Sequence, residues 1–146
     1  MNSPTFSCTR KIHFCAGHRV FQHESKCGNV HGHEYMIEIS ARPKSDLDSL
    51  GRVIDFSEIK AKVETWIDEN WDHGMLLNSQ DPIRSLWFKG ILKDHKFYVL
   101  PYNPTAENIA HYLLTEICPV LFADTNVEVF QITCHETPKC RATVTL

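Results

Sequence analysis

Hydrophobic and polar residues alternate along two segments near the N-terminal end of the sequence. In residues 5–16 every even position is apolar except Arg10. In residues 34–41 the odd positions are apolar, and Pro43, which cannot donate to a sheet ladder, follows shortly after. A period of two is typical of half-buried strands, so both segments are predicted to be strands that pair with each other.

Two later segments have apolar residues at helical spacing, each behind a capping signal. The first helix is predicted over residues 56–70, where Asp55 and Glu58 form a capping-box-like pair. The second is predicted after Asn103-Pro104-Thr105, because proline is favoured in a first turn and either Asn103 or Thr105 can cap it. The expected buried faces are Ile59, Val63, Trp66 and Ile67 in the first helix, and Ile109, Leu113, Leu114 and Ile117 in the second.

Two further alternating segments, residues 126–136 and 139–146, are predicted to be the closing strands. Residues 79–103 are the least regular part of the sequence, with room for a short helix over 82–92 and a short strand over 96–100. The main elements follow the order strand, strand, helix, helix, strand, strand, without an internal repeat. This order predicts an α+β fold, namely a four-stranded antiparallel sheet with two main helices packed on one face.

Composition narrows the class of protein. The 146 residues predict a single domain over 1–146 with a sizeable core, and 42% hydrophobic and 23% charged residues exclude a disordered chain. A formal charge of -3 without clustered Lys and Arg argues against a nucleic-acid partner. No apolar segment is long enough for a signal peptide or a membrane span, so we expect a cytoplasmic protein that does not contact a membrane.

The cysteine pattern agrees with that compartment. The sequence has six cysteines and no Cys-x-x-Cys pair, and a secretory signal is missing. Reduced thiols are therefore expected rather than a disulfide framework.

The segment Cys27-Gly28-Asn29-Val30-His31-Gly32-His33 contains the strongest candidate chemistry. Side chains two residues apart on an extended segment project to the same side, so His31 and His33 can converge on one ion. His18, at the end of the first predicted strand, offers a third nitrogen. Three imidazoles that leave one position open are typical of a catalytic zinc site, whereas structural sites are closed by four protein ligands.

Simpler interpretations remain open at this stage. A His-x-His pair can arise by chance in a chain with 9 histidines, and His18 is chosen over His13 and His23 only by its place at a strand end. Cys27 can be a fourth ligand, a reactive base or nucleophile, or a small buried hydrophobe. The dipeptide Asp72-His73 and the carboxylate of Glu136, taken alone, are ordinary surface residues.

Several short motifs, taken together and in order, resemble the 6-pyruvoyl-tetrahydropterin synthase and 6-carboxy-tetrahydropterin synthase (QueD) family of the tunnelling fold. The resemblance covers nearly the whole chain. Its motifs are His18 after the first strand, Cys27-x-x-x-His31-Gly32-His33, Val53-Ile54-Asp55-Phe56, Asp72-His73, Pro104-Thr105-Ala106-Glu107-Asn108 and His135-Glu136-Thr137.

The resemblance implies a role for each site residue. It implies Zn²⁺ as the cofactor, held by His18, His31 and His33. Cys27 would be the general base, with Asp72 and His73 as a relay for its proton. Glu136, helped by Thr105, would anchor the pterin ring, because a carboxylate accepts two parallel hydrogen bonds from a guanidine-like edge.

The resemblance also implies an activity and an assembly. The substrate would be 7,8-dihydroneopterin triphosphate, converted in the carboxy branch to 6-carboxy-5,6,7,8-tetrahydropterin with release of acetaldehyde, on the route to queuosine. The assembly would be a homohexamer, a dimer of trimers whose strands close into a barrel, with active sites between subunits.

The compact spacing of three residues between Cys27 and His31 favours the carboxy branch over the pyruvoyl branch. A zinc-stabilised pterin-binding module without catalysis is a further alternative. Residues 79–103 depart from the family, because this segment is longer than usual between the Asp-His pair and the Pro-Thr helix.

Overall fold

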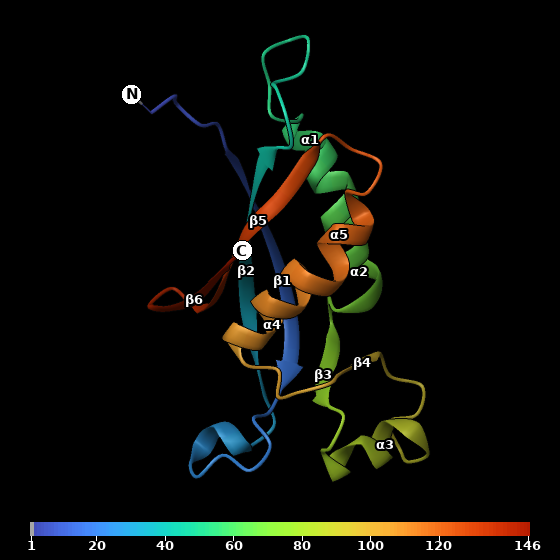
Figure 1. Ribbon diagram of the computed structural model, residues 1–146. Coiled ribbons are helices and arrows are strands. Elements are labelled where there is room, and N and C mark those ends of the chain that lie inside the picture. Colours follow the sequence, from blue (N-terminus) through green and yellow to red (C-terminus); the bar gives the residue numbers. More distant parts are fainter. Residues whose placement is uncertain (1) are drawn as a thin grey trace.

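The computed structural model describes residues 2–146, which form one curled six-stranded mixed sheet with helices on one face (Figure 1). The strand order across the sheet is β4-β3-β1-β2-β5-β6. The strands are β1 (Cys8–His18), β2 (His31–Pro43), β3 (Gly74–Asn78), β4 (Phe97–Leu100), β5 (Val127–Thr137) and β6 (Cys140–Thr145).

The four strands predicted from alternation form the antiparallel part of the sheet. β1 pairs with β2 along its whole length, β2 pairs with β5, and β5 pairs with β6. Burial follows the predicted period, since Ile12, Phe14 and Ala16 of β1 are buried and the residues between them are exposed. On β2, Tyr35, Ile37 and Ile39 are fully buried. Burying a side chain of this size contributes about 1.5–3 kcal/mol, so this face of β2 is a major source of stability.

The prediction of a four-stranded, wholly antiparallel sheet is wrong, because β3 and β4 extend it by parallel pairing. β3 pairs with β1 through Ala16–Gly74 and Gly17–Met75, and with β4 along its own length. All five residues of β3 are buried, with Leu76 in the main core and Leu77 in a smaller cluster around Trp87. A strand that is buried on both faces has no alternating polar residues, so β3 could not be predicted from alternation.

Two long helical stretches cover the same face of the sheet (Figure 1). The first joins α1 (Phe56–Ile59), a π-helical part (Lys60–Glu64) and α2 (Thr65–Asn70), matching the predicted helix over 56–70. The second joins α4 (Ala106–Tyr112), a π-helical part (Leu113–Ile117) and α5 (Cys118–Leu121). Besides these two main stretches, a 3₁₀ turn at Pro82–Arg84 and α3 (Ser85–Phe88) lie within the possible short helix over 82–92. The 3₁₀ turn at Lys26–Gly28 was not predicted, so the helical elements do not match the prediction in number.

The caps explain where the two long stretches begin. The side chain of Asp55 accepts a hydrogen bond of 2.9 Å from the backbone N–H of Ser57. Thr105 accepts one of 3.2 Å from the N–H of Asn108, so Thr105, rather than Asn103, is the cap of α4. Each such cap stabilises its helix by about 1 kcal/mol.

Two other expectations can be compared with the fold. No helix in residues 2–146 is long and apolar enough to cross a membrane. All six cysteines lie in this range, and each is a free thiol in the structure.

Candidate metal centre and active site

Three histidines converge where β1 ends and β2 begins. His18 is the register partner of His31, and Ala16 is the partner of His33. One ring nitrogen of each histidine lies within 4.8 Å of the others, which makes the three a candidate metal site. The convergence predicted from the period of two is therefore confirmed, and His18 is the third member of the cluster.

Glycine between the two β2 histidines has a steric reason. Gly32 pairs with Gly17 across the two strands. A Cβ atom at Gly32 would lie 3.1 Å from the carbonyl oxygen of Ala16, and one at Gly17 would lie 2.8 Å from Sδ of Met75. The two glycines thus allow β1, β2 and β3 to approach closely beside the histidines.

Backbone carbonyls fix the orientation of two of the rings. Nδ1 of His18 lies 2.6 Å from the carbonyl oxygen of Pro104, and Nδ1 of His31 lies 2.7 Å from that of Asn29. A carbonyl oxygen can only accept, so Nδ1 carries the proton in both rings and each neutral Nε2 presents a lone pair. The two Nε2 atoms are 3.1 Å apart, a separation of two lone pairs that a cation between them would stabilise.

Burial favours the neutral form of His18 and of His33, which is the form that binds a cation. His18 is 1% exposed, and burial lowers its pKa to about 4, despite the opposing effect of the hydrogen bond to Pro104. Burial likewise lowers the pKa of His33, and Nε2 of His33 is buried without a hydrogen-bond partner among residues 2–146. Three imidazoles whose ring nitrogens converge are a donor set that fits a transition-metal ion such as zinc.

Glu136, near the end of β5, faces the cluster. Its Oε1 oxygen lies 3.4 Å from Nε2 of His18 and 3.5 Å from Nε2 of His33. Its side chain remains 28% exposed, so it borders both the histidines and the open cavity beside them. The carboxylate adds negative charge next to the position that a cation would occupy.

A cavity of about 260 Å³ lies against the histidines and brings most of the predicted site residues together. Cys27 lines it from the 3₁₀ turn Lys26–Gly28, where it is half-buried. Thr105 and Glu136 line it from the start of α4 and the end of β5. The cavity is also lined by residues that were not predicted as site residues, among them His23, Glu107, Cys140 and Arg141.

The predicted relay pair lies elsewhere in the chain. Nδ1 of His73 is 2.7 Å from Oδ2 of Asp72, whose Oδ1 accepts a hydrogen bond of 2.9 Å from the N–H of Cys15. The ring of His73 is 79% exposed and lines a different hollow, on the side of His33 and Cys15. A single chain therefore does not place the relay in the cavity of Cys27.

The backbone at His73 is unusual. Its φ angle of 60° lies in the left-handed region, which few non-glycine residues adopt, and among residues 2–146 the only other non-glycine example is Gln22. The N–H of His73 donates a hydrogen bond of 2.6 Å to the carbonyl of Cys15, which helps to hold this conformation.

The sequence is similar to known pterin synthases along nearly its whole length. A family model described as 6-pyruvoyl tetrahydropterin synthase matches residues 7–146. A 6-carboxy-5,6,7,8-tetrahydropterin synthase from Rickettsia conorii is 44% identical over 133 residues, covering 91% of this chain and 95% of that protein.

Solved structures show the same fold. An uncharacterized protein from Wolinella succinogenes superposes with a TM-score of 0.83 at 25% identity, covering 98% of this chain and 99% of that one. A 6-pyruvoyltetrahydropterin synthase from Plasmodium vivax, bearing a substitution of a catalytic residue, gives a TM-score of 0.71 at 20% identity, covering 97% and 98%.

The curled sheet, the helices on one face and the histidine cluster between β1 and β2 define a tunnelling-fold protein with a candidate metal centre. The chain belongs to the 6-pyruvoyl tetrahydropterin synthase family. Its relatives are tetrahydropterin synthases, which supports an enzyme acting on a small pterin.

Proposed function

We propose that this protein is a zinc-dependent 6-carboxy-5,6,7,8-tetrahydropterin synthase that acts on 7,8-dihydroneopterin triphosphate and serves queuosine biosynthesis. The observation that carries the proposal is the meeting of His18, His31, Cys27, Thr105 and Glu136 around one cavity. The 44% identical relative from Rickettsia conorii bears the name of this activity and supports the choice.

Each residue of the site would have a separate role in the reaction. His18, His31 and His33 would hold Zn²⁺, which when bound acidifies the oxygens it contacts and stabilises negative charge on them. Cys27, as a thiolate, would accept a proton from a side-chain carbon of the substrate, after which triphosphate leaves by elimination. In the carboxy branch the side chain is then cleaved and acetaldehyde is released.

Glu136 would bind the pterin ring. Its carboxylate can accept two parallel hydrogen bonds from the 2-amino group and the ring N–H. Thr105 lies in the same cavity at the start of α4, where its hydroxyl already caps the helix and can also contact the ring. Together these two residues would orient the side chain of the substrate towards Cys27.

Assembly would complete the site. Within residues 2–146, the outer edge of β6 carries no further strand, and the edge of β1 opposite β2 is open along residues 8–15, because β3 covers that edge only at Ala16 and Gly17. Two open edges on one curled sheet favour strand addition between copies, which supports the expected hexamer of two trimers. In such an assembly the Asp72-His73 pair of one chain would serve the Cys27 of another.

Two alternatives remain distinct. A 6-pyruvoyl-tetrahydropterin synthase would use the same residues, and the spacing of three residues between Cys27 and His31 is what favours the carboxy branch. A non-catalytic zinc-stabilised module would keep the metal without turnover.

The test is to incubate the zinc-loaded protein with 7,8-dihydroneopterin triphosphate and to identify the products by mass spectrometry. Carboxy-tetrahydropterin together with acetaldehyde is the expected result, and pyruvoyl-tetrahydropterin would move the protein to the sister branch. No turnover by a folded, zinc-loaded protein would overturn the catalytic proposal. Native mass spectrometry of the same sample tests the hexamer, and a monomer would contradict the shared site.

A further inference from the structure

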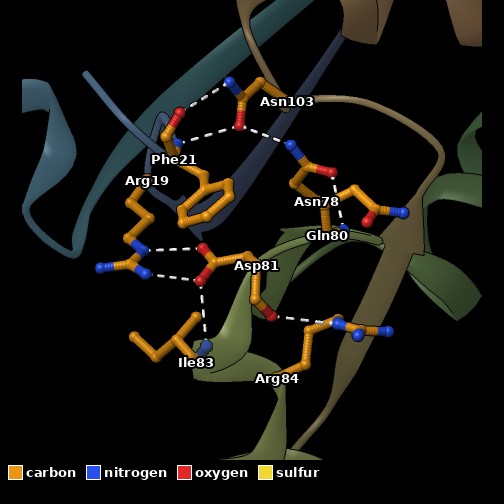
Figure 2. A network of polar contacts seen from close by, with 8 residues as sticks. All are labelled: Arg19, Phe21, Asn78, Gln80, Asp81, Ile83, Arg84 and Asn103. Atoms are coloured by element: carbon orange, nitrogen blue, oxygen red, sulfur yellow. Dashed lines mark hydrogen bonds and ion pairs between the residues drawn. The ribbon is translucent and has the colours of Figure 1, made fainter.

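The segment 79–103 forms hydrogen bonds with the residues that directly follow His18. The sequence alone indicates no function for this segment. Figure 2 shows Asp81 and Asn103, from the two ends of this segment, bound to Arg19 and Phe21. These contacts join residues more than 60 positions apart in the sequence.

The first contact is a fork-shaped ion pair. Nε of Arg19 donates to Oδ2 of Asp81 at 2.7 Å, and Nη2 donates to Oδ1 at 2.5 Å. Asp81 is fully buried and also accepts a hydrogen bond of 2.9 Å from the N–H of Ile83. Removing either partner would leave a buried or half-buried charge uncompensated, which makes this contact costly to lose.

The second contact holds the backbone of the next residue but one. The amide of Asn103 donates from Nδ2 to the carbonyl of Phe21 at 3.0 Å, and its Oδ1 accepts from the N–H of Phe21 at 2.9 Å. Nδ2 of Asn78 donates to the same Oδ1 at 2.9 Å, which fixes the orientation of the Asn103 amide. Asn103 therefore acts on Phe21 as a neighbouring strand would.

Both contacts are one step from site residues. The N–H of Val20, between Arg19 and Phe21, donates a hydrogen bond of 2.8 Å to the carbonyl of Cys27. Pro104, next to Asn103, supplies the carbonyl that orients the ring of His18. The segment thus reaches Cys27 and His18 through single hydrogen bonds.

We propose that Asp81, Arg19 and Asn103 are positioning residues, which clamp the loop 19–30 so that Cys27 keeps a fixed place beside His18. The segment 79–103 then has a function in the site, although none of these three residues lines the cavity. The proposal rests on the proposed function only where turnover is measured.

The test compares Asp81→Asn with Glu128→Gln in the zinc-loaded, full-length protein. Each substitution turns a carboxylate into its amide at an arginine pair, but the pair of Glu128 with Arg42 joins β5 to β2 away from the cavity and is about half exposed. Hydrogen exchange is followed in peptides covering residues 19–30 and 31–43. The alkylation rate of Cys27 is measured beside that of Cys15, an exposed thiol outside the loop.

Asp81→Asn is expected to speed exchange in residues 19–30 and to change the alkylation rate of Cys27 by about tenfold, with residues 31–43 and Cys15 unchanged. If turnover is detected, kcat should fall by a similar factor while zinc content stays at one per chain. Glu128→Gln should change none of these quantities.

Two milder variants keep the proposal testable if Asp81→Asn fails to fold. Arg19→Lys keeps the charge but loses the fork, and Asn103→Asp keeps the acceptor for the N–H of Phe21 but loses the donor to its carbonyl. Exchange and alkylation that match the unaltered protein in these variants would overturn the proposal. Exchange that becomes faster in residues 31–43 as much as in residues 19–30 would also overturn it, because such a change indicates a merely structural role. Absence of turnover with the local changes present would count against the proposed function alone.

Discussion

The carboxylate of Glu136 points at the imidazole of His18, with Oε1 3.4 Å from Nε2, although the two residues come from opposite ends of the chain. Glu136 therefore lies beside both the expected metal and the expected pterin. A substitution of Glu136 can affect zinc binding, pterin binding or both, and the two affinities can be measured separately.

Glu136→Gln is expected to keep one zinc per chain and to weaken pterin binding by about 10–100-fold, because a charge-assisted pair of hydrogen bonds is lost while three histidines remain. Zinc content by atomic emission and pterin affinity by calorimetry are the two measurements. Glu128→Gln, at a carboxylate remote from the cavity, is the control. Loss of zinc from Glu136→Gln would mean that this carboxylate is itself a metal ligand.

Cys27→Ala should retain zinc and lower kcat by at least about 100-fold, since the proposed general base is removed while the three proposed metal ligands remain. Cys8→Ala, which truncates a thiol at the end of β1 opposite to His18, should leave both quantities unchanged. A parallel fall in zinc affinity and thermal stability would instead identify Cys27 as the fourth ligand of a closed structural site.

His33→Ala should lower zinc affinity by more than about 100-fold with little effect on the stability of the metal-free protein. The reason is that Nε2 of His33 makes no hydrogen bond within residues 2–146 and only a contact of 3.5 Å with Oε1 of Glu136, so its loss breaks no internal hydrogen bond. A titration against a chromophoric chelator measures the affinity, and urea unfolding measures the stability. His13→Ala, at an exposed ring on β1, is the matched control.

Mixed oligomers test whether the site is shared. Cys27→Ala and His73→Ala chains should each be inactive, and co-expression should restore part of the activity, because the two residues line different hollows of one chain and would meet only between chains. Activity that stays at the level of the separate variants would show that the pair acts within one chain or not at all.

The loss of folding stability at acid pH should depend in part on Asp81. Burial opposes ionisation of this carboxyl, but the hydrogen bonds from Arg19 and Ile83 outweigh it and hold its pKa below the ordinary value of 3.8. The stabilisation is thus complete above pH 3.8 and is lost as the pH falls through the lower folded pKa. Urea unfolding between pH 5 and pH 2 should therefore show a shallower acid slope for Asp81→Asn than for the unaltered protein. Equal slopes would mean that the pKa of Asp81 is the same in the folded and unfolded states, so that its ion pair adds no acid-sensitive stability.

Local patterns were enough to predict the antiparallel strands, the helix over 56–70 and the histidine cluster. Each of these depends on a repeat that residues close in sequence carry, such as the alternation that places His31 and His33 on one side of β2. β3 could not be predicted in this way, because Leu76 and Leu77 are buried on opposite faces and no polar position marks the strand. The parallel pairing with β1 also joins segments that are far apart in sequence.

The site was predicted as residue types but not as a geometry. Motifs pointed to Glu136 and Cys27, yet nothing in the sequence shows that the carbonyls of Pro104 and Asn29 set the ring orientations. Backbone acceptors have no residue signature. The same holds for Asn103, which looked like a helix cap and is instead bound to Phe21.

Because His18 pairs with His31 across β1 and β2, the positions of the histidines and the position of Cys27 depend on different parts of the chain. The ligand set depends on strand register, which the buried faces of Ile12, Phe14 and Ile37 enforce, since a slip of one residue would turn these side chains out of the core. The residues between the strands are not part of that constraint. The length of this connection can therefore change, and with it the place of Cys27, without altering the histidine cluster.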